Sequence, residues 1–524
     1  MIEPNPLPAR GVARRTFQSV ASLFPTEVHE DSPRPDLPRP AVVEMREAAE
    51  LTDDLMGGTR AMRANHEKWI GQEEAESDKN YEQRRKRATC FPFYKDTLLD
   101  LAARPFGREL VWAGDPPDGF AEFLHDVDGT GKSLTVFAKD TLLFGMHRGM
   151  DHCLVDSSSE SGKTAESTAM RRVYAQRIDA LSLLDVRDKA DASGRKRVEY
   201  CRFVKVETKD TNEFEHEVEA VIVELTKEIG EEPGTRVEWR FDKDGKKWVA
   251  GAAQLYNPGK NGIPLFTVYM EQTGPYEASP VLEDLAWVNL AHYQSRTDHA
   301  HVMRIARLIT LVTLGFDDDD SVRDPNAKKA KTVVLGPLSR INSRKKPTEA
   351  SVFFLEPSGK SIELSFQDMD TLADECKRLG ARHLMSKTGN ITARAVTTDD
   401  QKATNNLQAF CLRIDVYLRQ ILEAVADWLS AEALADEALP RVWKEFSTVV
   451  NPELGSRALR DISDVLSRRQ KLREAVRYGI LAADFPIEEN LEELQEESKE
   501  AIDAAIATAA GTPEIGRASC RERV

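Results

Sequence analysis

Residues Ser279 to Phe316 read SPVLEDLAWVNLAHYQSRTDHAHVMRIARLITLVTLGF and predict one long helix. Pro280 fits the first turn of a helix, and acidic residues follow it where the helix dipole favours negative charge. We expect the helix to run to Leu314, because Gly315 disfavours its continuation. At 1.5 Å per residue this helix would be roughly 50 Å long, and the other elements are arranged along the chain on either side of it.

A small β module is predicted after this helix. Its strands are Thr332 to Leu335, Ser351 to Leu355 and Ser361 to Leu364, and a tight turn at Glu356 to Gly359 joins the last two. Two basic clusters lie within the module. In an acidic protein they favour an acidic partner or a phosphate backbone, and a solvated loop stays open as the alternative. The clusters are Lys328, Lys329 and Lys331, then Arg340, Arg344, Lys345 and Lys346.

Two amphipathic helices are predicted beyond the module. Ser365 caps the first, whose apolar stripe is Met369, Leu372, Cys376 and Leu379. The second begins at the capping box Thr398 to Gln401, and its apolar residues recur at close to 3.5 positions, as in helices packed side by side. These residues are Leu407, Phe410, Ile414, Tyr417, Ile421, Val425 and Trp428. Short helices are expected from Ala431 to Ala510.

The residues before the long helix predict a mixed helical and β region. The pattern is helical from Ala41 to Phe106 and again, as two helices, from Phe120 to Gly149. A buried strand is predicted at His152 to Val155. Alternating strands and an Asp-Gly hairpin are predicted between Tyr200 and Val249. The fold class is therefore α+β.

The two ends of the chain are set apart by composition. Eight prolines in residues 1–40 predict a flexible arm. The last residues, Glu514 to Val524, resemble the translation of a sequencing adapter, and residues 514–524 are therefore excluded from the fold prediction.

Composition indicates a soluble globular protein with several subdomains. The chain has 524 residues, and 72 Lys and Arg against 88 Asp and Glu give a net charge of −16. That charge argues against a protein that coats nucleic acid through a generally basic surface. The most apolar run, Ile305 to Phe316, is too short to span a bilayer, and the six cysteines form no CxxC pair. We expect a reducing intracellular environment, no secretory signal and no membrane.

Several segments imitate catalytic or metal-binding motifs. Ser157 to Thr164 (SSSESGKT) has the second half of a P-loop, but Ser157 replaces the glycine that must approach phosphate closely. Asp126 to Ser133 fails as a P-loop for the same reason and lacks the final glutamate of a calcium loop, so it predicts a turn between helices. His292, His299 and His301 cannot share one metal on a helix. We therefore expect no enzyme, cofactor or metal.

The element order and several segments resemble the portal proteins of tailed bacteriophages, in particular a family that is defined by an uncharacterised domain with a long central helix. The segments are His66 to Leu110, Asp126 to Asp156, Ser279 to Phe316, Leu379 to Val396 (LGARHLMSKTGNITARAV) and Asn405 to Leu429. The resemblance extends over roughly residues 45 to 510. They are diffuse patterns rather than catalytic signatures, and Ser279 to Phe316 is the most specific of them.

The resemblance implies a homo-oligomeric ring, usually of twelve subunits, at one vertex of the capsid. Terminase drives double-stranded DNA through such a ring during packaging, and the genome is later ejected through it. In family terms the chain would divide into a wing at 41–278, a first stem helix at 279–314, a clip at 315–363, a second stem helix at 364–380, a tunnel loop and tunnel helix at 381–430, and a crown at 431–513.

The resemblance also implies two sets of contact residues. In the tunnel loop, Lys387 and Arg394 would lie nearest the DNA, and Thr388, Asn390 and Thr392 would donate hydrogen bonds to phosphates. A surface loop that faces outward or into the neighbouring subunit is the alternative. The basic clusters of the clip, defined above, would bind the large terminase or a head-completion adaptor protein.

Scaffold or major capsid protein is a further implied partner, and the protein would reside in the virion and, during assembly, in the host cytoplasm. Two other classes stay open. A P-loop motor or terminase-like ATPase would use Gly162, Lys163 and Thr164, and a DNA-processing protein would bind free duplex tightly.

Overall fold

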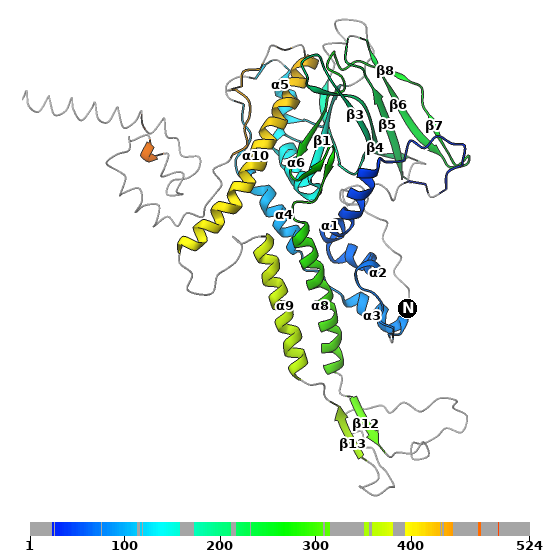
Figure 1. Cartoon of the computed structure of the whole chain (residues 1–524), viewed down its shortest axis with the longest axis vertical. Helices are drawn as coiled ribbons and strands as arrows, with labels where there is room; N and C mark the ends of the chain where they lie inside the picture. The colour runs from blue at the N-terminus through cyan, green and yellow to red at the C-terminus, as the bar shows by residue number, and fades with distance from the viewer. Residues whose placement is uncertain are drawn as a thin grey trace, which may run out of the picture. The chain divides into compact units, whose positions relative to one another are not determined.

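The computed structural model of the chain has an α+β fold, as predicted (Figure 1). It describes residues 24–25, 27–74, 76–112, 116–117, 119–157, 172–210, 216–230, 232–307, 310–314, 351–355, 359–380, 393–429, 431, 434–436, 438–443, 470–472 and 491. The chain divides into two compact units, Met1–Ile391 with Asn405–Trp443, and Thr392–Thr404 with Lys444–Val524. The elements below belong to the first unit, apart from the start of the last helix.

Helices form the first part of the chain, as predicted. They are α1 (Pro40–Ala64), α2 (His66–Trp69), α3 (Asp78–Arg87), α4 (Phe93–Ala103), the 3-10 helix η3 (Arg104–Phe106), α5 (Phe120–His125) and α6 (Leu134–Arg148). Ser77 and Ser133 precede α3 and α6, and each accepts a hydrogen bond from a backbone N–H of the first turn. Such caps satisfy donors that a helix leaves unpaired at its start.

Two antiparallel sheets pack against each other. The small sheet has the order β2-β1-β9, and the large sheet has the order β3-β4-β5-β6-β7 with β8 also paired to β6. Their strands are β1 (Met150–Ser157), β2 (Val173–Ile178), β3 (Leu183–Ala190), β4 (Lys196–Asp210), β5 (His216–Thr226), β6 (Gly234–Asp242), β7 (Lys247–Ala250), β8 (Gln254–Tyr256) and β9 (Leu265–Tyr269). A separate hairpin joins β10 (Gln272–Gly274) to β11 (Glu277–Ala278).

The core between the sheets follows from the two-residue period of their strands. In the large sheet Phe203 of β4 lies opposite both Leu183 of β3 and Val223 of β5. These side chains form one buried cluster with residues of the small sheet such as Leu154 and Leu265. The predicted strands and the hairpin between β6 and β7 are confirmed. They could be predicted because alternating apolar residues and turn residues specify them locally.

The outer face of the large sheet carries a second apolar cluster. Trp248 belongs to it, and Phe24 and Val28 pack against it from the segment before α1. Ser32 Oγ accepts a hydrogen bond from Trp248 N at 3.1 Å. The prediction of a flexible arm over residues 1–40 therefore does not hold for residues 27–39, which lie along the sheet. Residues 1–23 lie outside the described part.

The long helix is shorter than predicted. Helix α8 spans Glu283–Arg307, and the strand β12 (Thr310–Leu314) follows it. β12 pairs antiparallel with β13 (Ser351–Leu355), so that prediction of a strand is confirmed while the predicted helix end at Leu314 is wrong. The sequence Thr-Leu-Val-Thr-Leu is rich in β-branched residues, which favour a strand when a partner strand is available.

Helix α9 begins earlier than predicted. It spans Gly359–Gly380, so the predicted strand Ser361 to Leu364 is helical and Ser365 is not its cap. Met369 and Cys376 of its predicted stripe are buried, but Leu379 is 52% exposed. The helix starts early because Ile362 and Ser365 continue the heptad spacing of Met369 and Cys376, and packing against α8 favours that face over a strand.

The last long helix, α10, spans Ala393–Leu429 and also begins before its predicted cap at Thr398. Five residues of its predicted stripe are buried, namely Leu407, Ile414, Tyr417, Ile421 and Val425. Arg413 of α10 donates to Tyr269 O at 3.0 Å and to Met270 O at 2.7 Å, which fixes the helix beside the small sheet. The predicted strand Thr332 to Leu335 lies outside the described residues, as do most of residues 431–513.

Candidate interaction site: the α8–α9 helix pair

A buried polar network holds the start of α8. Asn289 is fully buried: its Oδ1 accepts from Tyr94 N at 3.0 Å, and its Nδ2 donates to Phe91 O at 3.1 Å. The Tyr94 phenol lies 3.0 Å from His147 Nδ1, and His147 Nε2 lies 3.0 Å from Asp53 Oδ1. One chain of contacts therefore connects α8 to α4, α6 and α1.

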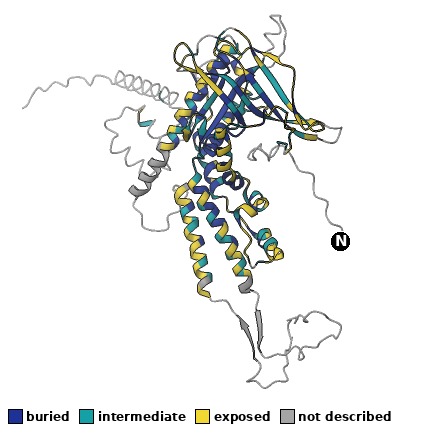
Figure 2. Cartoon of the chain, turned by 45° about the vertical axis from the view of Figure 1, so that its right-hand side comes forward, coloured by how far each residue is buried: buried dark blue, intermediate teal, exposed yellow. Residues whose placement is uncertain are grey.

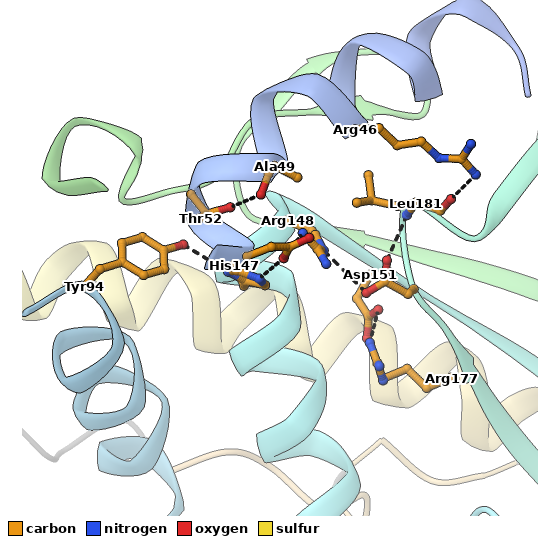
Figure 3. A network of polar contacts seen from close by, with 11 residues as sticks. Arg46, Ala49, Thr52, Tyr94, His147, Arg148, Asp151, Arg177 and Leu181 are labelled. Carbon is orange, nitrogen blue, oxygen red and sulfur yellow. Dashed lines mark hydrogen bonds and ion pairs between the residues drawn. The ribbon is translucent and has the colours of Figure 1, made fainter. Parts of the chain in front are cut away.

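Charged residues continue this network below the sheet. Arg148 pairs with Asp53 at 2.6 Å, and Arg177 pairs with Asp151 at 2.9 Å; Figure 3 shows Arg177 turned toward Asp151 and Tyr94 toward His147. Burial lowers the pKa of His147, and the neighbouring Arg148 lowers it further. Burial also raises the pKa of Asp151, to about 8, against the opposing effect of Arg177. His147, Arg148 and Asp151 are buried. We interpret the contacts from Asn289 through Tyr94 and His147 to Asp53 as a rigid attachment of α8.

Aromatic contacts support the next turn of α8. The His292 ring lies edge-on to Phe91 and Phe93, with centroids 5.5 and 5.2 Å away. The Arg296 guanidinium lies 4.2 Å from the centre of the Phe91 ring, a cation–π contact. Burial, and then Arg296, lower the pKa of His292, which favours the neutral ring. His292 therefore packs as an aromatic side chain.

Helices α2 and α3 contact one side of α8. Gln294 Nε2 donates to Trp69 O at 2.7 Å. Arg84 of α3 pairs with Glu76 at 2.7 Å and with Asp298 of α8 at 3.3 Å. Burial of Arg84 is thus compensated by two carboxylates, as a buried cation requires.

Helix α9 lies antiparallel against another side of α8. Ser295 Oγ donates to Asp368 Oδ2 at 2.8 Å, and His299 Nδ1 lies 3.0 Å from Ser365 Oγ. Only a narrow stripe of α9 is buried, and Figure 2 shows most of this helix as exposed. Large apolar side chains are exposed along the pair: Trp287 (54%), Leu364 (65%), Phe366 (53%) and Leu379 (52%).

A two-stranded ribbon continues the pair. β12 begins three residues after the end of α8, and β13 ends four residues before the start of α9. An isolated two-stranded ribbon is marginally stable in water, and two helices with exposed apolar flanks leave area unburied. The exposed apolar side chains of the pair are therefore suited to contact with other protein surfaces.

The predicted contact residues are not tested by the structure. The clip residues Lys328, Lys329, Lys331, Arg340, Arg344, Lys345 and Lys346 and the loop residues Lys387, Thr388, Asn390 and Thr392 lie outside the described residues. Arg394 belongs to α10, but its side chain also lies outside the described part. Of the P-loop-like segment only Ser157, at the end of β1, is described.

The structure describes the other segments that resemble metal-binding or phosphate-binding motifs. The loop Asp126 to Ser133 connects α5 to α6, as predicted, and Asp126 Oδ1 accepts from Gly131 N at 2.8 Å. His299 contacts α9, whereas His292 packs between aromatic rings. In the part of the chain that the structure describes, no three His, Cys, Asp or Glu side chains are grouped as metal ligands would be. Among the described helices none has the length and apolarity to cross a membrane.

The sequence did not predict that Trp287 and Leu379 are exposed. Trp287 lies seven residues before Gln294, on the side of α8 that faces α2 and α3. The exposure of Trp287 could have been predicted from its position, because it lies in an otherwise polar stripe of the helix that contains Asp284, Gln294 and Asp298. Leu379 continues an apolar stripe in the sequence, so nothing in the pattern separates it from a core residue.

Comparison with known proteins gives one family match. Residues 281–429, which include α8, α9 and α10, match a domain of unknown function, DUF4055. No curated protein matches the sequence.

Among solved structures, the chain is similar to components of gene transfer agent particles. A chain from the neck of an empty particle, computed with C6 symmetry, is 10% identical with a TM-score of 0.38, over 78% of this chain and 95% of that one. One from the neck of a native particle, computed with C12 symmetry, is 9% identical with a TM-score of 0.34, over 73% and 88%. A chain of the native virion is 9% identical with a TM-score of 0.35, over 79% and 97%. TM-scores below 0.5 are too low to assign this chain to the fold of those proteins.

Proposed function

We propose that the chain is a subunit of a bacteriophage portal, a ring through which double-stranded DNA enters the capsid and later leaves it. The observation that carries the proposal is the α8–α9 pair, because two antiparallel helices joined through a β ribbon have exposed apolar flanks that one chain leaves uncovered. In this reading α8 and α9 are the stem, and β12 and β13 belong to the clip. The resemblance of the sequence to portal proteins supports the same assignment.

The proposed role is structural rather than enzymatic. The ring would sit at one capsid vertex, bind the large terminase through the basic clusters of the clip, and later bind an adaptor of the head–tail connector. A net charge of −16 per chain fits a conduit, because each neutralised phosphate would release counterions and add affinity that slows DNA movement. The packaging motor would supply the ATP hydrolysis.

Sedimentation and negative-stain imaging of the purified full-length chain test this proposal. We expect rings with a central channel at micromolar concentration. A compact monomer in several salts would contradict it. Steady ATP hydrolysis that is lost in Lys163→Ala would favour a motor, and tight, salt-sensitive binding of free duplex by monomers would favour a DNA-processing protein.

A further inference from the structure

A cleft of about 1400 Å³ lies beside β9, the last strand of the small sheet in the order β2-β1-β9. Thr267 of β9 lines it, together with Val198 of β4, Tyr276 of the β10–β11 hairpin and Trp428 of α10. All four residues belong to the first compact unit. Sites for small molecules usually measure ~300–1,000 Å³, so this cleft has room for a segment of polypeptide.

The backbone of β9 directs alternate residues into this cleft. Val155 N donates to Pro264 O at 3.1 Å and Met270 N donates to Gly149 O at 2.6 Å, so the even-numbered residues of β9 pair with β1. Thr267 therefore directs its N–H and C=O away from β1. Within the described part of the chain neither of these two groups has a hydrogen-bond partner. An unpaired strand edge of this kind is a template for another strand.

Residues 4–8 of the chain, with the sequence PNPLP, have proline at every second position. Proline has no N–H to donate, and successive residues of a strand direct their backbone groups to opposite edges. A strand over residues 4–9 could therefore donate along one edge only, through Asn5, Leu7 and Ala9, and its proline edge would have no donors. Each residue before a proline is also restricted to extended conformations, which lowers the entropy lost on pairing.

The arm that carries these prolines is long enough to reach the cleft. Phe24 packs against Trp248, and Arg39, further along the same segment, donates to Tyr276 O at the cleft. Phe24 and Arg39 are 15 residues apart, and Leu7 and Phe24 are 17 residues apart. At about 3.1 Å per residue an extended stretch of that length covers roughly 50 Å. Residues 4–9 can therefore return to the cleft of their own chain.

We propose that residues 4–9 pair with β9 of the same chain as a fourth strand of the small sheet, with Leu7 opposite Thr267. Residues opposite each other in a sheet lie on the same face, so Leu7 would extend the apolar cluster that contains Leu265 and packs against Tyr276. The proline edge would face outward and close the sheet, which prevents pairing of β9 with other chains. This docking concerns one copy and does not depend on the proposed ring.

Amide hydrogen exchange at Thr267 tests the docking, in the full-length chain and in a variant that lacks residues 2–11. We expect the Thr267 amide to exchange about tenfold or more slowly in the full-length chain. Leu7→Pro removes an N–H from the paired edge and should abolish this protection, whereas Leu7→Ala keeps the N–H and should retain most of it. Pro6→Ala is the matched control, because it adds an N–H to the outer edge and should leave the exchange unchanged.

A synthetic peptide of residues 1–12, added to the shortened chain, gives a second measurement. It should restore the protection of Thr267, and the same peptide with Leu7→Pro should not. Fast exchange at Thr267 in the full-length chain would overturn the inference, as would equal protection in the full-length and shortened chains. Protection that falls on dilution would show that the strand comes from another copy, against the assignment to the same chain. None of these results bears on whether the chain forms rings.

Discussion

His152 is one of the buried groups that make the stability of the protein depend on pH. It is fully buried in β1, its Nδ1 lies 2.9 Å from Thr267 Oγ1, and burial lowers its pKa to about 3. An unfolded histidine titrates near ~6.5, so below that pH the unfolded state binds a proton that the folded state excludes. The stability is fully present above pH 6.5 and is lost toward pH 3, at about 1.4 kcal/mol per pH unit.

The glutamine of His152→Gln does not titrate. Between pH 7 and pH 5 the free energy of unfolding should therefore fall by about 2 kcal/mol less in this variant than in the parent. Urea unfolding at the two pH values measures the difference. Equal losses in the two proteins would mean that His152 does not cause the pH dependence.

Replacing a glycine can destabilise a protein through backbone strain and through steric collision, and Gly129 and Gly149 allow the two effects to be compared. Both have positive φ, +84° and +80°, which strains any other residue. A Cβ at Gly149 would collide with the backbone of Ser279, whereas nothing lies within 4 Å of a Cβ at Gly129. Gly129→Ala should cost about 1 kcal/mol, the backbone cost alone. Gly149→Ala should cost several times more, because the backbone of Ser279, in the segment before α8, must move. Thermal unfolding of both variants checks the ratio.

The attachment of α8 depends on the buried amide of Asn289 more than on its exposed contacts. Asn289→Ala leaves Tyr94 N and Phe91 O without partners inside the protein, at a cost of about 2–4 kcal/mol. Gln294→Ala removes one hydrogen bond at an exposed position and should cost under ~1 kcal/mol. Hydrogen exchange at the start of α8 should increase in the first variant alone. Similar exchange in both would show that the network does not hold this helix.

In the proposed ring, we expect the segment between α9 and α10, together with the first turn of α10, to face the DNA. The double variant Lys387→Ala/Arg394→Ala removes the two cations that we expect nearest the duplex, and it leaves the α8–α9 flanks unchanged. Rings should form normally, while packaging or retention of DNA changes, because phosphate contacts position the duplex. Packaging and retention equal to those of the parent would place these two residues away from the channel.

The sequence alone determined the elements whose signals are local. Alternation and an Asp-Gly turn specified β6 and β7, and the stripe from Leu407 to Val425 specified the buried face of α10. The α+β class and the order of the elements follow from such patterns, because period and turn chemistry act within a few residues.

Tertiary structure decided the features that depend on distant partners. Thr310–Leu314 is a strand because Ser351–Leu355 pairs with it, and Ser361 to Leu364 is helical within a helix that packs on α8. The sequence shows that Trp287 and Leu379 are apolar, but their exposure depends on how α8 and α9 pack with each other and with the helices around them. Local energies of a strand and a helix differ by less than the energy of these long-range contacts, so the contacts decide.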